Sequence, residues 1–309
     1  MTKSKMPSHH GHKESIHGEY PNETIRLLME RASCRNFADK RIPEDVLNTI
    51  LDVGTHAATG GNLQPYSIIK IESGETSAKL AEMCGQEFIA KAPVNLLFCI
   101  DWRRLERWAE LQTAPFTANQ SFRHFWISFQ DTLICAQNIC TAADAVGLGS
   151  VYIGTIMEYI REAREMFGLP GGVLPVVLLS LGYPASQTMV RRKLGRAAIV
   201  HDEKYKEMSD QDLMRAFDEK YHHAKIELTE ERLNKIREVC RRVHGQRFAE
   251  QCVARIKDSG YINVCQRYFG LHYEADVMPA HNEEFIAAIR ESGFGWFEKF
   301  SPEIDDVPA

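Results

Sequence analysis

Two arginines and a serine at alternating positions near the start of the chain provide the first chemical signal. Arg31, Ser33 and Arg35 lie in the stretch LMERASCRNF, directly after an amphipathic segment. In an extended backbone the three side chains share one face, and in a helix the two arginines are neighbours four residues apart. Two adjacent guanidinium groups with a hydroxyl between them suit the oxygens of a phosphate. A solvated pair with ion pairs to Glu30 or Asp39 explains the same residues, so this segment alone leaves both interpretations open.

A second candidate binding segment is the stretch AATGGNLQPYS. Gly60 and Gly61 allow a ligand to approach the backbone closely, and Asn62 and Gln64 each offer an amide donor and an amide acceptor. Small residues followed by two amides suit a flat polar heterocycle that is recognised from its edge. An ordinary surface loop that carries two polar side chains is the alternative.

Two further stretches are weaker signals when each is taken alone. The stretch GLGSVYIGTI is a Gly-rich turn after an apolar helix, and such a turn can point backbone N–H groups at a ligand. It lacks the GxGxxG nucleotide fingerprint. The basic triplet in MVRRKLG includes Arg192 and Lys193 and follows a predicted buried strand. A basic triplet of this kind is usually a solvated surface patch.

Composition narrows the class of protein. The chain has 309 residues, 44% of them hydrophobic and 26% charged, which is ordinary for a globular protein. Its net charge of −5 argues against nucleic-acid binding through bulk charge. The eight cysteines form no CxxC pair, and several, Cys34 among them, are interpreted as packing residues, which favours a reduced, cytoplasmic protein. The apolar stretches are shorter than the ~18 residues that a membrane span needs, so no membrane partner is expected.

The first 20 residues carry four histidines at irregular spacing. The sequence shows no set of acidic or cysteine ligands that converges with them. We therefore expect a mobile, His-rich N-terminal arm over residues 1–20 and no metal site.

Hydrophobic periodicity predicts the elements that must position the candidate residues. Helices are expected over 21–30 with Asn22 as N-cap, from Pro43 as the first helical residue, over 74–93, over 121–146 and over 158–170. Strands are expected over 66–72, 94–100 and 173–184, and the second is expected to be central because it is apolar throughout.

The helix predicted over 121–146 has an unusual distribution of charge. From Thr132 to Val146 its only charged residue is Asp144. No face is then left for water, so we expect burial in a large core or against another subunit. Gly147 or Gly149 is expected to end the helix in the left-handed conformation.

Taken in order, five segments resemble the FMN-dependent nitroreductase superfamily, from about residue 22 to residue 205. They are RASCRNF, GGNLQPYSIIKI, AQNICTAADAVGLGSVYIG, LGYP and RRKLGRAAIVHDEKY. The resemblance implies an α+β fold with a central, mostly antiparallel sheet flanked by helices. It also implies an intertwined homodimer with two FMN sites at the interface, in which the long apolar helix forms the dimer core.

The resemblance implies a role for each candidate segment. The FMN phosphate would be held by Arg31, Ser33 and Arg35 together with Arg192 and Lys193. The flavin would lie along Gly60, Gly61, Asn62 and Gln64, with the backbone N–H groups of Tyr152, Ile153 and Gly154 near the ring edge at N5. The chain departs from the family pattern at Ala58-Thr59, where Pro-Ser is common.

The function implied is an FMN-dependent oxidoreductase. Hydride would pass in a ping-pong cycle from NADH or NADPH, through flavin N5, to a small acceptor such as a nitroaromatic or a quinone, with no catalytic side chain. The alternatives are another flavin reaction on the same scaffold, such as reductive dehalogenation or a dehydrogenase or oxidase step, and a non-catalytic flavin-binding sensor or carrier.

The expected domain organisation is an FMN-binding core over 21–207 and a helical C-terminal extension over 208–309. We expect the extension to pack on the core and interpret it as a candidate lid over the active site. Candidate substrate-clamping residues within it are Arg267, Tyr268, His272, Tyr273 and Glu274.

Overall fold

One four-stranded antiparallel sheet organises the structure, which is a computed structural model that describes residues 20–300. The strand order is β1-β2-β4-β3, with the bounds Tyr66–Ile71 for β1, Val94–Asp101 for β2, Gly149–Ile153 for β3 and Val173–Gly182 for β4. Every residue of the two inner strands, β2 and β4, is buried. These continuous apolar runs therefore pack on both faces, which confirms the expected central position of β2 and the α+β fold with an antiparallel sheet.

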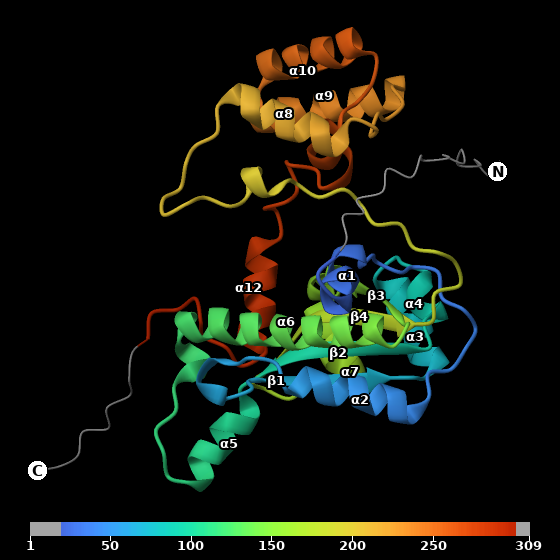
Figure 1. Ribbon diagram of the computed structural model, residues 1–309. Helices are drawn as coiled ribbons and strands as arrows, with labels where there is room; N and C mark the ends of the chain where they lie inside the picture. The colour runs from blue at the N-terminus through green and yellow to red at the C-terminus, as the bar shows by residue number, and fades with distance from the viewer. Residues whose placement is uncertain (1–19, 301–309) are drawn as a thin grey trace, which may run out of the picture.

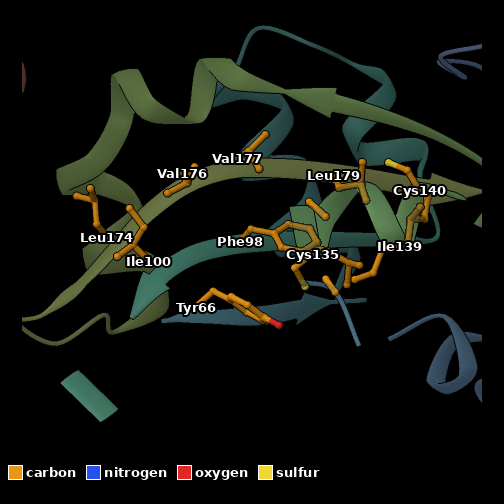
Figure 2. Packing of buried hydrophobic residues seen from close by; sticks show 14 of the residues in the cluster. Tyr66, Phe98, Ile100, Cys135, Ile139, Cys140, Leu174, Val176, Val177 and Leu179 are labelled. Carbon is orange, nitrogen blue, oxygen red and sulfur yellow. The ribbon is translucent and has the colours of Figure 1, made fainter. Parts of the chain in front are cut away.

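Helices cover both faces of the sheet (Figure 1). The helices before β4 are α1 (Glu23–Glu30), α2 (Glu44–Thr55), α3 (Gly74–Met83), α4 (Phe88–Lys91), α5 (Arg103–Leu111), α6 (Phe122–Ala145) and α7 (Ile160–Phe167), with short 3-10 turns η1 (Gly60–Asn62), η2 (Ala118–Gln120) and η3 (Gly154–Tyr159). One hydrophobic cluster joins α2 and α6 to the sheet, and a second joins α3, α4 and α7 to it. Figure 2 shows the first cluster, where Phe98 of β2 and Leu179 of β4 pack with Ile139 of α6.

The predicted helix boundaries hold in part. The Asn22 side chain accepts a hydrogen bond from the Ile25 N–H at 3.0 Å and caps α1 as expected. Helix α2 begins at Glu44, so Pro43 precedes the helix and is not its first residue. The single helix expected over 74–93 is wrong, because the chain breaks at Gly85, whose φ of +63° ends α3 before α4 begins.

Helix α6 buries one face only. Cys135, Ala136 and Ile139 are fully buried against the sheet, whereas the exposed fractions of Trp126 and Ile134 are 50% and 41%. The all-round burial expected for this helix is therefore incomplete in a single chain. Beyond its end, Gly147 adopts the left-handed conformation with φ of +78°, as expected for a helix stop.

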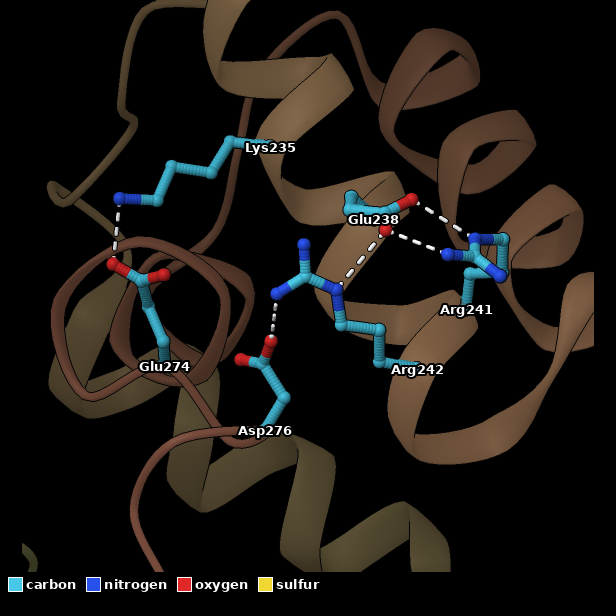
Figure 3. Close-up of polar contacts among 6 residues, drawn as sticks. All are labelled: Lys235, Glu238, Arg241, Arg242, Glu274 and Asp276. Atoms are coloured by element: carbon cyan, nitrogen blue, oxygen red, sulfur yellow. Dashed lines mark hydrogen bonds and ion pairs between the residues drawn. The ribbon is translucent and has the colours of Figure 1, made fainter. Parts of the chain in front are cut away.

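The C-terminal residues form a group of helices in which α9 (Glu230–His244) and α10 (Gln246–Ser259) pack together and share a small core. After the turn η4 (Arg196–Ala198), the elements are α8 (Asp210–Tyr221), α9, α10, α11 (Val264–Arg267), the π-helical turn η5 (Tyr268–His272) and α12 (Asn282–Glu291). Its buried cluster consists of Leu233, Ile236, Val253, Ile256 and Ile262. Ion pairs of Glu238 with Arg241 and of Arg242 with Asp276 line its surface (Figure 3).

The end of the described chain returns to the main core. Phe294 and Trp296 belong to the hydrophobic cluster that contains the sheet and α6. The indole N–H of Trp296 donates a hydrogen bond to the Ala118 carbonyl at 3.2 Å. Along the chain, α8–α10 therefore come between two segments that are attached to the core, and Figure 1 shows these three helices grouped apart from the sheet.

Replacement of Gly149 by alanine tests the contact that fixes the 31–37 segment. A Cβ atom at Gly149 would lie 2.5 Å from the Cβ of Cys34, which cannot move without its backbone. We expect a loss of about 1–3 kcal/mol in the free energy of unfolding, measured with urea. The control is Gly74→Ala, where a Cβ meets nothing within 4 Å. Equal stability of the two variants would contradict this account.

Candidate functional site

The 31–37 segment is extended and lies against strand β3. Ser33 pairs with Ser150 in a parallel bridge, and the Cys34 N–H donates to the Ser150 carbonyl at 2.9 Å. The extended alternative is thus the one that the chain adopts. Cys34 is buried, and burial raises the pKa of its thiol, as expected for a packing residue and not for a reactive thiolate.

Arg31 lies in a partly buried polar pocket between β3 and the end of α6. Its Nη2 donates to Ser150 Oγ at 3.2 Å, and its Nε lies 3.7 Å from Asp144 Oδ2. Among the described residues, neither this Nε nor this Oδ2 has a hydrogen-bond partner, although both are buried. The ion pair that the sequence suggested with Glu30 does not form, because Glu30 pairs with Arg26 at 2.5 Å. Arg31 therefore has a buried Nε donor without a hydrogen bond, with Asp144 as its ion-pair partner.

Asp144 is the carboxylate that faces Arg31. Burial raises the pKa of Asp144 to about 6, and the nearby Arg31 guanidinium offsets part of that rise. A carboxylate in this position is poorly solvated at neutral pH. The pocket, which the Arg26–Glu30 pair also lines, therefore holds an acid beside Arg31 that titrates close to physiological pH.

The remaining predicted phosphate ligands are exposed. Arg35 lies over the Phe88 ring, with its guanidinium carbon 5.9 Å from the ring centroid, so it and Arg31 contact different elements. Arg192 and Lys193 are exposed in the coil that follows β4. Within the described chain, no hydrogen bond or ion pair links these two residues to Arg31, Ser33 or Arg35.

The 59–64 loop is held by a carboxylate of α6 that the sequence analysis did not single out. Asp131 Oδ2 accepts hydrogen bonds from Thr59 Oγ1 at 2.7 Å and from the Gly60 N–H at 3.0 Å. Asp131 is buried, and its position on the apolar helix is the only sequence signal that could have revealed it, since a buried charge requires partners.

The loop residues take strained backbone conformations. Gly61, Asn62 and Gln64 have positive φ values of 60°, 55° and 50°. Two of these three are not glycine, and such conformations cost energy and gather at ligand sites. The Gln64 amide nitrogen donates to the Thr55 carbonyl at 2.9 Å, while the Asn62 side chain is exposed. The loop thus presents the Asn62 amide to solvent on a fixed backbone.

The Gly-rich turn borders an open cavity. Tyr152 and Gly154 line a cavity of about 520 Å³ together with residues of α6, among them Phe129 and Gln137. Ile153 between them is buried. A Cβ at Gly154 would meet nothing within 4 Å, so this end of β3 opens into the cavity.

The structure joins some of the predicted residues and separates others. Ser33 and Tyr152 lie at the same edge of the sheet, because the 31–37 segment pairs with the edge strand β3. The 59–64 loop is held at Asp131, thirteen residues along α6 from Asp144, or about 20 Å at the helical rise per residue. The loop is therefore attached near the middle of α6, whereas Arg31 lies near the C-terminal end of that helix.

Neither a candidate metal site nor a membrane-spanning helix is present among the residues that the structure describes. Residues 20–300 contain no group of three or more His, Cys, Asp or Glu side chains that could hold a metal ion. The N-terminal histidines lie outside the described residues. No described helix is long and apolar enough to cross a membrane.

A match to a protein-family model identifies the family to which the chain belongs. The nitroreductase family model matches residues 28–183. This range covers half of the chain and contains every candidate flavin residue except Arg192 and Lys193. The chain belongs to the nitroreductase family.

Curated relatives and solved structures are similar over different lengths. The oxygen-insensitive NADPH nitroreductase of Salmonella typhimurium is 32% identical over 197 residues, which are 63% of this chain and 80% of that protein. The FMN reductase (NADPH) of Bacillus subtilis is 29% identical over 191 residues, 61% of this chain and 77% of that protein. The solved structure of B. megaterium NfrA2 is 26% identical, covers 90% of this chain and all of its own, and has a TM-score of 0.69.

Substitution of Asp131 tests the anchor of the 59–64 loop. Asp131→Ala removes the acceptor of two hydrogen bonds, and we expect a loss of about 1–3 kcal/mol because the half-buried Thr59 hydroxyl and the Gly60 N–H lose their partner. Asp131→Asn keeps an acceptor oxygen of the same size and should lose less. Urea unfolding measures both variants, and an equal loss in both would show that the hydrogen bonds are not what anchors the loop.

Asp144→Asn tests the pH dependence of the Arg31 pocket. Because the pKa of Asp144 is raised to about 6 in the folded chain, its protonated form favours folding, and this stability is lost as pH rises through about 6. We expect Asp144→Asn to be more stable than the parent at pH 8 and equally stable near pH 4. Denaturation midpoints at both values measure the difference, and a difference that does not grow with pH would refute the assignment.

Proposed function

We propose that this chain is an FMN-dependent oxidoreductase that transfers hydride from NAD(P)H to a small acceptor such as a nitroaromatic or a quinone. The observation that carries the proposal is membership of the nitroreductase family over the range that contains the candidate residues. Relatives of about 30% identity bear the names FMN reductase, NADPH-flavin oxidoreductase and NADPH nitroreductase.

The residues of the 31–35 segment fit the phosphate of FMN. Arg31 has a buried Nε without a hydrogen bond, and Ser33 is exposed beside it on the same extended segment. A guanidinium and a hydroxyl are a suitable donor set for phosphate oxygens. Arg35, Arg192 and Lys193 are exposed cations that we assign to the same phosphate, the last two by sequence resemblance.

The isoalloxazine ring would be held by the other two segments. Gly60, Gly61, Asn62 and Gln64 supply backbone and amide groups on a rigid loop, and Tyr152 to Gly154 border the open cavity. When bound, FMN supplies the hydride chemistry at N5, so the protein contributes binding and orientation and no catalytic side chain is assigned.

We infer that the functional unit is a homodimer with FMN at the interface. The exposed apolar side chains Trp126 and Ile134 leave one face of α6 for a partner. In one chain the 59–64 loop is attached near the middle of α6 and Arg31 lies near its end, about 20 Å away, and a two-fold axis across this helix would bring the loop of one chain towards the arginines of its partner. The buried free thiols Cys99 and Cys135 fit the proposed cytoplasmic location.

We propose the C-terminal extension as a cover for the acceptor site. Its last helix is held to α7 by a two-pronged ion pair in which Arg161 donates to Glu291 at 2.6 and 2.8 Å. Among the candidate clamp residues, Glu274 is engaged by Lys235 at 2.5 Å within the extension (Figure 3). This contact favours a structural role for Glu274, so no observation raises dehalogenation or another flavin reaction above the proposed one.

The experiment that tests the function is an anaerobic titration of the FMN-loaded protein. NADH or NADPH should bleach the flavin absorbance, and a nitroaromatic or a quinone should restore it. A protein that binds FMN but is bleached by neither nicotinamide would instead be a flavin-binding sensor or carrier, or would use another electron donor.

Arginine substitutions test the phosphate assignment. Arg31→Ala and Arg35→Ala should each lower FMN affinity about tenfold or more, because each removes a charge-assisted hydrogen bond worth about 1.5–3 kcal/mol. Fluorescence titration of the apoprotein with FMN measures the affinity. Arg255→Ala, an exposed arginine of α10, is the matched control. Unchanged affinity in both test variants would remove these arginines from the phosphate site.

A further inference from the structure

A second cavity lies next to the 59–64 loop, on the side of α5. It has a volume of about 540 Å³ and lies between α5, the edge of the sheet and the end of α7. Ile69, Cys99, Leu169 and Val173 give it an apolar floor. We call it the α5 groove. None of its lining residues is among the candidate flavin ligands.

One face of α5 supplies a cationic rim to this groove. Arg103 and Arg107, one helical turn apart, both line it. Within the described residues, neither has a carboxylate within ion-pair distance, and the side chain of Arg103 makes only a 3.5 Å hydrogen bond to the Gly171 carbonyl. Glu106 is not part of the groove and accepts a hydrogen bond from Asn119 at 3.2 Å. The groove therefore carries positive charge that the chain leaves uncompensated.

A third arginine makes the wall of the groove rigid. Arg104 Nη2 donates to the carbonyls of Gln64 and Tyr66 at 2.7 and 2.9 Å. The one acidic residue of the groove, Asp101, accepts from Ser67 Oγ at 2.5 Å and from the Arg104 backbone N–H at 3.1 Å. Asp101 therefore already has partners and does not neutralise Arg103 or Arg107.

The same face of α5 exposes large apolar side chains. The exposed fractions of Trp108 and Leu111 are 57% and 73%, and both line the groove. Trp108 also lines a neighbouring cavity of about 530 Å³ that contains Gln64. An indole beside two arginines offers a surface for a flat ring together with donors for an anion.

We propose that the α5 groove binds a planar aromatic molecule that carries a phosphate or carboxylate group. The ring would pack on Trp108 and the apolar floor, and the anion would lie between Arg103 and Arg107. A nucleotide and an aromatic carboxylate share this chemistry. The proposal rests on the groove alone and does not depend on the proposed function.

Calorimetry on the FMN-loaded protein tests the proposal. The probes are 2′,5′-ADP and 4-nitrobenzoate, and uncharged nitrobenzene is the control ligand. The variants are the double substitution Arg103→Ala/Arg107→Ala and the single substitution Trp108→Ala, with Arg255→Ala as the control protein. FMN content and bleaching by NAD(P)H are measured in parallel, so a failure of the proposed function is detected separately.

We expect at least one anionic probe to bind. The double substitution and Trp108→Ala should each lower the affinity for that probe about tenfold or more, while the FMN content stays unchanged. Binding of 2′,5′-ADP alone identifies a nucleotide, and binding of 4-nitrobenzoate alone identifies an aromatic acid. The proposal is overturned if neither anion binds, if the double substitution weakens nitrobenzene as much as it weakens the anions, or if the variants bind like Arg255→Ala. It is also overturned if sedimentation shows that the double substitution separates the chains, because the groove is then an interface.

Discussion

Burial of one face of α6 on the sheet is the constraint on which the candidate site depends. That face carries a carboxylate near its middle, Asp131, and the helix carries another near its end, Asp144. A carboxylate removed from water costs several kcal/mol unless partners reach it. The 59–64 loop supplies Thr59 Oγ1 and the Gly60 N–H at one position, and Arg31 approaches at the other. Packing of the helix thus fixes where both binding segments lie.

The elements of the fold were predictable where a single physical pattern controls them. The apolar runs of β2 and β4 allow no exposed face, so the sequence alone places both strands inside the sheet. The break between α3 and α4 was missed because the hydrophobic pattern continues through it. Gly85 ends the helix by adopting positive φ, and a glycine in a helical pattern does not by itself reveal whether it does so.

The candidate site was predictable only as separate segments. Alternation of Arg31, Ser33 and Arg35 suggested an anion, but spacing along the chain could not show that Arg31 faces Asp144 and Ser150. Such contacts join residues more than a hundred positions apart, so they follow from tertiary packing and leave no local pattern. Asp131 was missed for the same reason, since one acidic residue in a helix is normally solvated. The positive φ values of Asn62 and Gln64 likewise depend on the completed loop.

The C-terminal helices illustrate how a chain stabilises a segment with little core of its own. Five buried aliphatic residues between α9, α10 and the Ile262 turn are few for independent stability. The segment is instead attached at both ends, by β4 before it and by Phe294 and Trp296 after it. Attachment at two points limits the conformations of the segment before it orders. The segment therefore loses less conformational entropy when it orders. Placement of α8–α10 therefore depends on the main core, and a change that loosens Trp296 from Ala118 would act on the whole extension.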